Sequence, residues 1–315
     1  MLIDYQGVKF GTQPTDYVAG VNTPLGVNII NPSADWDIYR TEHELQNKGY
    51  ETSACTIFSD LDIIETIFMY YLKNSLIPPG DVLWLKNNGY FNNGFINFSD
   101  RYSAQFAEID PLVGTYQYKA GNAVRRGLIP EWLFPYTTDN YYDQSQITAK
   151  MTALAEEFKR RFTINWFWVE NPSMALHASP LQGVVRYANG TGILKPEGKL
   201  NHAIMIYKED DDCYRIDDSY TERDKRYDKD FIFSFIGFSL TINSNIMDTE
   251  KFIKENDLKF VRNSNTGAFG RIIRGKLRVI NTSDKGSLIL LDDKIREGGV
   301  NMSDSDWKQL PKVNF

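Results

Sequence analysis

The spacing of apolar residues changes from a helical to a strand-like pattern near residue 162, and this change restricts the folds open to the chain. In the first half, one stretch places an apolar side chain at every third or fourth position, as a half-buried helix requires. These side chains are Ile57, Leu61, Ile64, Phe68 and Tyr71. We expect Thr52 or Ser53 to cap this helix, and the helix to end before the helix-breaking Pro78-Pro79-Gly80.

Two more segments with helical spacing precede residue 162, and strand patterns follow it. The longer helical segment covers 147–162, and a shorter candidate covers 114–127. The strand candidates are TINWFWVE (163–170), GVVRYA (183–188), HAIMIYK (202–208) and CYRIDDS (213–219). The acidic EDDD between the last two strands predicts a hairpin turn. Helices followed by strands are typical of the α+β class rather than of alternating α/β folds.

Composition divides the chain into three expected parts. Residues 1–34 are rich in Pro, Gly and Asn and predict an extended arm, and residues 35–245 form the main domain. Residues 246–315 predict a small β domain. The segment 250–315 carries 13 Lys and Arg against 9 Asp and Glu, so the tail is basic in a chain of net charge −6. Its alternating cations, which form either a solvated face or a surface for an anionic or protein partner, are Arg271, Arg274, Lys276 and Arg278.

The composition is that of a folded, soluble protein. With 42% apolar residues in 315, the chain can fill a substantial core. Its start lacks a positively charged segment followed by an apolar run, and no stretch reaches the roughly 18 apolar residues needed to cross a bilayer. We therefore expect no secretion signal, no membrane contact and a cytoplasmic or virion-associated location. Two cysteines, Cys55 and Cys213, are too few for a disulfide framework and fit a reducing compartment.

Cys55 is the first candidate for chemistry because it lies at the start of the predicted helix. A thiol attacks acyl carbons as the thiolate, and a helix N-terminus favours that negative charge. The alternative is a small apolar residue packed in the helix, which is the ordinary role of a buried cysteine. A nucleophilic role needs a base within hydrogen-bond reach and a third group that orients the base.

His202 is the best candidate for that base among three histidines. It opens the strand HAIMIYK, and the partner strand of the predicted hairpin ends with Asp217 and Asp218 near its level. One of these carboxylates can then accept a hydrogen bond from the imidazole. His177 is the alternative base, and His43 is expected to be a solvated side chain.

These residues resemble the papain-like cysteine peptidases. The resemblance rests on Asp35-Trp36, SACTIFS around Cys55, GLIPEWLFPY at 127–136, NHAI at 201–204 and DDSY at 217–220, and it covers about 200 residues. It implies a two-lobed fold with Cys55 in a helical lobe and His202 in a β-rich lobe. The absence of a long segment before Asp35 is similar to the compact bacterial and phage members of the family.

The same resemblance selects two further site residues. In the family an asparagine follows the histidine by sixteen positions, and here that position is Asp218, so Asp218 rather than Asp217 is expected to orient His202. A carboxylate there adds negative charge and should hold His202 protonated more strongly. The family also places a glutamine six residues before the nucleophile, where this chain has Gly49. Gln46 takes that oxyanion role if the loop NKGYETS contains a three-residue insertion.

The resemblance implies a cysteine endopeptidase that uses Cys55, His202, Asp218 and Gln46 on a peptide or protein substrate, with no cofactor and no metal. The acidic Glu209–Asp212 run lacks the glycine and terminal glutamate of a calcium loop and fits a solvated turn. A peptidase-shaped structural or binding protein with little turnover, such as a virion or scaffold component, is the alternative. A third class is another acyl-transfer enzyme with the same Cys, His, Asp order.

Overall fold

The computed structural model describes residues 29–220 and 222–243 with their side chains, and the backbone of short strands within 4–9 and 260–313. The chain divides into two compact units, Met1–Ile242 and Asn243–Phe315, and each is described by itself. The predicted connection after residue 243 and the side chains of the basic tail lie outside the described residues.

Helix α1 (Cys55–Lys73) is the central element of the first unit. Its N-cap is Ala54, and no side chain caps it, so the predicted caps at Thr52 and Ser53 are wrong. Ser53 has a left-handed φ of 54° and donates its hydroxyl to the Pro111 carbonyl, so the chain enters the helix through a sharp bend. The bend places Cys55 in the first turn.

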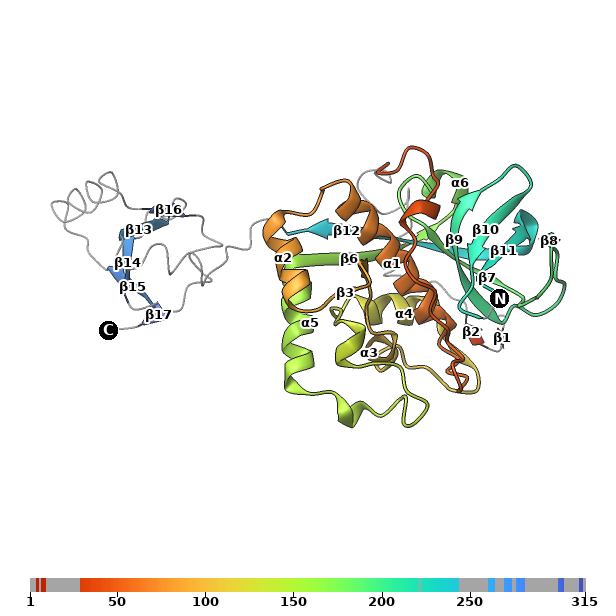
Figure 1. The fold of residues 1–315 in the computed structure, drawn as a ribbon, viewed down its shortest axis with the longest axis horizontal. Coiled ribbons are helices and arrows are strands. Elements are labelled where there is room, and N and C mark those ends of the chain that lie inside the picture. The colour runs from red at the N-terminus through yellow and green to blue at the C-terminus, as the bar shows by residue number, and fades with distance from the viewer. Residues whose placement is uncertain are drawn as a thin grey trace. The chain divides into compact units, whose positions relative to one another are not determined.

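Helices cover one side of α1 and strands cover the other (Figure 1). The helices on that side are α2 (Pro79–Asn87), α3 (Asp100–Ala104), α4 (Gln117–Val124) and α5 (Ala149–Arg161), whereas the short α6 (Pro172–Ala175) lies on the side of the strands. The predicted helix at 147–162 is confirmed as α5, which Thr148 caps. The candidate at 114–127 is only partly helical, because its first residues form β5 (Gly114–Tyr116).

A seven-stranded sheet provides the second side, in the order β6-β12-β7-β9-β10-β11-β8. Its strands are β6 (Phe162–Val169), β7 (Leu181–Val185), β8 (Ile193–Leu194), β9 (His202–Glu209), β10 (Cys213–Asp217), β11 (Asp224–Asp228) and β12 (Phe233–Ile242). The predicted hairpin is confirmed, since β9 and β10 pair antiparallel around the acidic turn. The α+β class is therefore confirmed.

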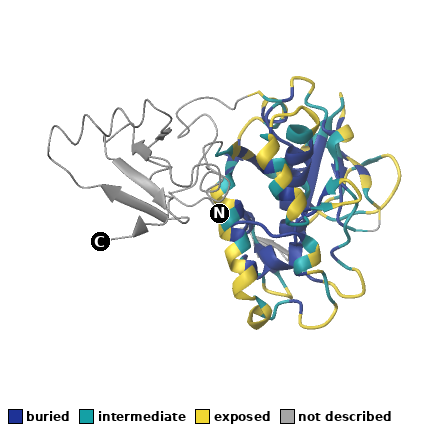
Figure 2. Ribbon diagram, turned by 60° about the vertical axis from the view of Figure 1, so that its left-hand side comes forward, coloured by how far each residue is buried: buried dark blue, intermediate teal, exposed yellow. Residues whose placement is uncertain are grey.

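The core fills the space between α1 and both sides (Figure 2). Phe68 of α1 lies against the rings of Phe98, Phe158 and Phe162, with centroids 5.1 to 5.8 Å apart. Trp166 and Trp168 are buried in the same cluster. Burial of these large side chains fixes the sheet against α1 and thereby places the residues at the start of β9.

Short elements complete the first unit. The expected arm contributes β1 (Asp4–Tyr5) and β2 (Gly7–Lys9), and β2 pairs parallel with β5. The other short elements are β3 (Phe91–Asn92), β4 (Phe95–Ile96) and the 3-10 turns Asp37–Tyr39, Glu131–Leu133, Gln144–Gln146 and Lys229–Phe231.

The second unit contains a five-stranded sheet in the order β16-β13-β14-β15-β17. Its strands are β13 (Phe260–Asn263), β14 (Phe269–Ile273), β15 (Lys276–Ile280), β16 (Val300–Met302) and β17 (Lys312–Val313). Strands β13, β14 and β15 pair antiparallel.

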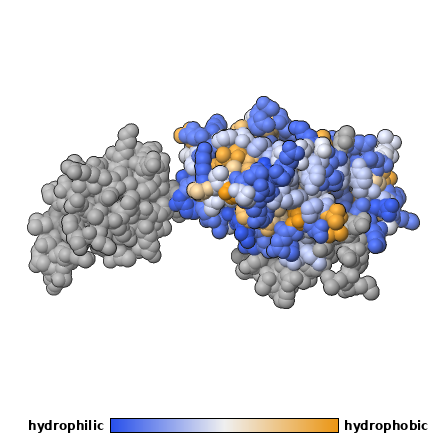
Figure 3. All heavy atoms as spheres, turned by 90° about the horizontal axis from the view of Figure 1, so that it is seen from below, coloured by the Kyte–Doolittle hydropathy of each residue, from blue (hydrophilic) through white to orange (hydrophobic). Residues whose placement is uncertain are grey.

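The surface of the described part of the first unit is largely hydrophilic on the face in Figure 3, with small separate apolar spots. None of the helices in the described residues is both long enough and apolar enough to span a bilayer.

Gly127 gives a test of the packing between α4 and α5. Its φ is 106°, and a Cβ there would lie 2.1 Å from the Ala155 carbonyl oxygen. Gly127→Ala should therefore destabilise the protein by more than the roughly 1 to 2 kcal/mol of left-handed strain alone. Gly94→Ala is the matched control, because Gly94 has a φ of 89° and open space around it. Urea denaturation measures both, and equal losses would contradict the predicted clash.

Candidate active site

Cys55 lies at the contact between α1 and the sheet. It is 2% exposed and packs against Val184, Leu200 and Ala203. Its backbone N–H belongs to the first turn of α1, where no carbonyl of the helix can accept it. The position therefore offers a sulfur and an unpaired N–H at the positive end of a helix dipole.

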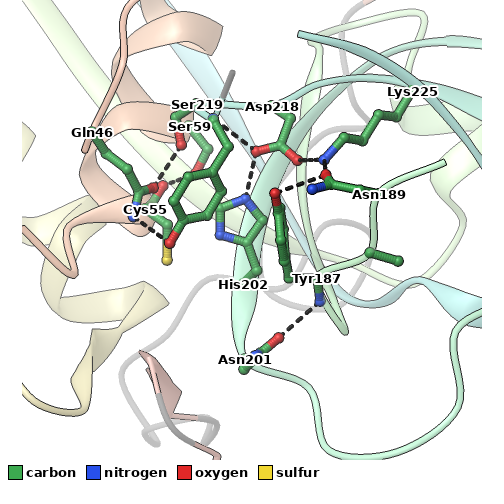
Figure 4. Close-up of polar contacts among 12 residues, drawn as sticks. Gln46, Cys55, Ser59, Tyr187, Asn189, Asn201, His202, Asp218, Ser219 and Lys225 are labelled. Atoms are coloured by element: carbon green, nitrogen blue, oxygen red, sulfur yellow. Dashed lines mark hydrogen bonds and ion pairs between the residues drawn. The ribbon is translucent and has the colours of Figure 1, made fainter. Parts of the chain in front are cut away.

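His202 lies next to this sulfur from the start of β9. Its Nε2 is 2.7 Å from Asp218 Oδ1 (Figure 4), and Cys55 lies close enough to the imidazole to influence its charge. Because Nε2 faces the carboxylate, Nδ1 is the nitrogen left for the thiol. The structure thus brings together Cys55, His202 and Asp218, the three residues that the sequence predicts.

The charges of this group support one another. Burial is the largest influence on His202 and lowers its pKa, but the charge and hydrogen bond of Asp218, with the contact to Cys55, raise the pKa of His202 to about 10. Burial alone would raise the pKa of Asp218, but His202 and Lys225 together lower it to about 2. The imidazole is therefore a cation and Asp218 an anion at neutral pH.

Asp217 points to a different set of partners. Its Oδ2 accepts hydrogen bonds from Arg40 at 3.1 Å and from Arg223 at 2.7 Å. Adjacent residues in an extended chain point to opposite sides, so only one of the two aspartates can face His202. The structure places Asp218 in that position.

Lys225 is a site residue that the sequence analysis missed. Its Nζ lies 2.7 Å from Asp218 Oδ2, on the side of the carboxylate away from His202 (Figure 4). A weak signal was present, because Lys225 and the apolar Tyr227 are two residues apart and therefore share the buried face of β11.

Two tyrosines cover the imidazole. The Tyr220 ring lies 4.8 Å from the His202 ring, and the Tyr187 ring meets it edge-on at 5.5 Å. The Tyr220 N–H also donates to Asp218 Oδ1 at 3.1 Å. These rings shield the pair of His202 and Asp218 from water, which strengthens their electrostatic attraction.

Gln46 lies on the Cys55 side of the imidazole, 1% exposed (Figure 4). Its Oε1 accepts a hydrogen bond from the Ser219 hydroxyl at 2.7 Å. Its Nε2 donates to Glu51 Oε1 at 2.8 Å and to the Tyr220 hydroxyl at 3.2 Å. The amide that would stabilise an oxyanion is therefore engaged by a carboxylate from its own loop.

A buried polar cluster supports the start of α1. Gln182 of β7 donates to the Thr56 carbonyl at 2.9 Å, to Ser59 Oγ at 2.8 Å and to Asp60 Oδ1 at 2.6 Å. Burial, and then the nearby charge of Cys55, raise the pKa of Asp60 well above its ordinary value. The Asp60 carboxyl therefore tends to keep its proton.

The other histidines lie apart from this chemistry. The expectation that His43 is solvated is wrong, because it is half-buried and its Nε2 is 2.8 Å from the Asp218 carbonyl oxygen. The imidazole thereby contacts the backbone of the segment that carries Asp218. His177 offers its carbonyl to the N–H groups of Ile30 and Asn31, and no contact in the described residues links it to Cys55.

Cys213 is buried in β10. The Glu209–Asp212 run contains the turn of the β9–β10 hairpin. In the part of the chain that the structure describes, no group of three His, Cys, Asp or Glu side chains is arranged to hold a metal ion.

Comparison with known proteins yields matches among solved structures. No protein-family model and no curated protein matches this chain. The chain is similar to a bromelain protease from Ananas comosus at 15% identity and a TM-score of 0.43, which covers 65% of this chain and 97% of that one. It is also similar to a cysteine protease from Carica candamarcensis at 15% identity and a TM-score of 0.46, covering 65% and 96%.

A recombinant stem bromelain precursor is a third match, at 17% identity and a TM-score of 0.46, covering 71% of this chain and 77% of that one. All three likenesses have TM-scores below 0.5, so the papain-like resemblance of the sequence stays a prediction. At identities of 15 to 17%, these likenesses do not establish the chemistry of this chain. That chemistry has to be derived from its own side chains.

The raised pKa of His202 predicts how stability depends on pH. The folded state holds a proton on His202 up to about pH 10, whereas the unfolded imidazole loses it near 6.5. The stabilisation is therefore complete below pH 6.5 and is lost as pH rises from 6.5 to about 10.

Urea denaturation between pH 6 and pH 10 measures this loss. The decline should be shallower in His202→Gln, while the matched control His177→Gln should keep the wild-type slope. Identical slopes in all three proteins would contradict the assignment.

Proposed function

We propose that the first unit is a cysteine peptidase that hydrolyses peptide bonds through an acyl-enzyme. The observation that carries this proposal is the contact of Cys55 with an imidazole that Asp218 holds at 2.7 Å. A thiol at a helix N-terminus beside an imidazole is the arrangement that a cysteine nucleophile needs, because the thiolate is the form that attacks acyl carbons.

The chemistry follows from the positions of these groups. The Cys55 thiolate attacks the carbonyl carbon of a peptide bond, and the carbonyl electron pair moves to the oxygen. When this intermediate collapses, the C–N bond breaks and His202 gives its proton to the departing amine. Water then loses a proton to His202 and attacks the thioester, which releases the carboxylic acid and restores the thiolate and the imidazolium.

Two donors are available for the oxyanion. The first is the Cys55 N–H in the first turn of α1, and the second is Gln46 Nε2 once it leaves Glu51. Asp218 does not touch the substrate and acts as a positioning residue for His202. The substrate in this proposal is a peptide or protein.

A peptidase-shaped binding protein with little turnover is the second candidate. The hydrogen bond between Gln46 and Glu51 favours it, because it occupies an amide that hydrolysis needs. A peptidase turns over a peptide substrate at Cys55, whereas a binding protein retains a reactive thiol without cleaving the peptide.

Reaction with a thiol-directed epoxide tests the peptidase. The folded protein should be modified at Cys55 and lose its hydrolysis of a denatured protein substrate. His202→Ala should slow modification at pH 7 strongly, because the thiol loses its imidazolium partner. Peptide mapping by mass spectrometry identifies the modified cysteine.

Cys213 is the internal control, since it is buried against Arg226 and Asp210 and has no imidazole beside it. Modification of Cys55 without any hydrolysis would favour the binding protein. Equal modification of Cys55 in wild type and His202→Ala would overturn the proposed pair.

The oxyanion role of Gln46 predicts opposite effects for two neighbouring residues. Gln46→Ala should lower kcat by about 10² to 10³ with little change in KM, because the donor acts in the transition state. Glu51→Ala should raise kcat, because it frees the amide that Glu51 engages. Steady-state kinetics on a fluorogenic peptide measures both, and a similar loss in the two variants would show that the contact is only structural.

A further inference from the structure

We propose that Lys225 is a positioning residue of the active site, which neutralises the outer oxygen of Asp218 and so sets the protonation of His202. The inference rests on the proposed function for its catalytic meaning. Its physical content, a coupling between a buried ammonium and an imidazole through one carboxylate, is measurable without any turnover.

The geometry of Lys225 supports this role. Its side chain is 1% exposed, and that of Asp218 is fully buried. Nζ donates to Asp218 Oδ2 at 2.7 Å and to Asn189 Oδ1 at 2.9 Å, and it lies 4.4 Å from the centre of the Tyr187 ring. Two hydrogen bonds and one cation–π contact satisfy a charge that would otherwise be costly to bury.

The position in the strand shows that this burial is specific. In β11 the residues Asp224, Arg226 and Asp228 lie on the more exposed face, while Lys225 and Tyr227 are buried. Lysine is almost never fully buried unless it is paired. A hydrophobic residue would suit this inward position, so the ammonium is explained by the carboxylate in front of it.

The two oxygens of Asp218 divide its charge between two cations. Oδ1 faces His202 Nε2 and Oδ2 faces Lys225 Nζ, each at 2.7 Å. A carboxylate with no second partner would hold the imidazolium proton more strongly. The sequence predicts that the Asp218 carboxylate keeps His202 protonated more strongly. The positive charge of Lys225 offsets part of this effect.

Other titratable groups face the same carboxylate and imidazole. Tyr220 and Tyr227 lie near Asp218, Cys55 contacts the imidazole from α1, and His43 reaches the Asp218 carbonyl oxygen. Among these groups, Lys225 is the one whose cationic group forms an ion pair with the Asp218 carboxylate besides His202. Removing it changes the charge that His202 experiences without touching the imidazole.

The test is the NMR titration of the imidazoles, which is tractable because the chain has only three histidines. Lys225→Met should raise the pKa of His202 by about one pH unit, because the carboxylate loses its second cation. Asp218→Asn should lower that pKa, because the ammonium remains without the carboxylate. The His202 pKa of the double variant should lie between those of Asp218→Asn and wild type.

The double variant also covers a failure of Lys225→Met to fold, since it removes the buried charge pair as a whole. In that case the comparison of Asp218→Asn with the double variant gives the effect of Lys225 alone. Lys208→Met is the matched control, because Lys208 of the same strand as His202 pairs with Asp35 instead. It should leave the His202 titration unchanged.

The outcomes separate this inference from the proposed peptidase. A His202 pKa that rises on loss of Lys225 in either background supports the inference even if no variant cleaves peptides. A His202 pKa that stays constant or falls in both backgrounds overturns it, even if the protein is an active peptidase. The pH dependence of Cys55 alkylation by iodoacetamide should shift among the variants in the same order as the His202 pKa. The transition of this profile on the alkaline side should move to higher pH in Lys225→Met.

Discussion

The burial of charge at the contact between α1 and the sheet is the constraint on which this site depends. Cys55, His202 and Asp218 are each at most 2% exposed. Charged groups can be buried there only if each one meets a partner of opposite sign or a hydrogen-bond donor. The row of imidazole, carboxylate and ammonium meets this requirement, because opposite charges alternate along it.

The dipeptide Asp217-Asp218 links this row to the rest of the unit. Asp217 binds Arg40 from the segment before α1 and Arg223 from its own strand connection, while Asp218 binds His202 and Lys225. Two neighbouring carboxylates of like charge are tolerated because they point to opposite sides and each meets two cations. The segment before the helix and the sheet are thereby held together at the place where the reactive groups meet.

Local patterns in the sequence were sufficient for part of this arrangement. The helix at Cys55, the hairpin and the level of Asp218 follow from spacing, because a helix turn and an antiparallel pair fix short-range geometry. The α+β class follows from the order of those patterns. The placement of Gln46 rests on an insertion in its loop, and the structure places its amide in contact with Glu51.

Other features depended on contacts between distant segments. Lys225 in a short charged strand gives no sign of its partner, since a lysine is usually solvated. His43 was expected in solvent because its own surroundings in the sequence are polar, yet its ring reaches the Asp218 carbonyl across 175 positions. The start of α1 was misplaced for a similar reason, since the Ser53 hydroxyl bonds Pro111 instead of capping the helix.

Two kinds of buried acidic group occur in the first unit. In the helical part, burial is the largest cause that raises the pKa of Glu44, Asp100 and Glu131 above their ordinary values, so these carboxyls tend to keep protons. In the β part, Asp218 stays ionised because cations face it. Burying a protonated carboxyl costs less free energy than burying a carboxylate, but a protonated carboxyl exerts no strong electrostatic attraction on an imidazole. A carboxylate in an ion pair orients the imidazole. The cations of the β part are therefore what turns the contact between helix and sheet into a site with chemistry.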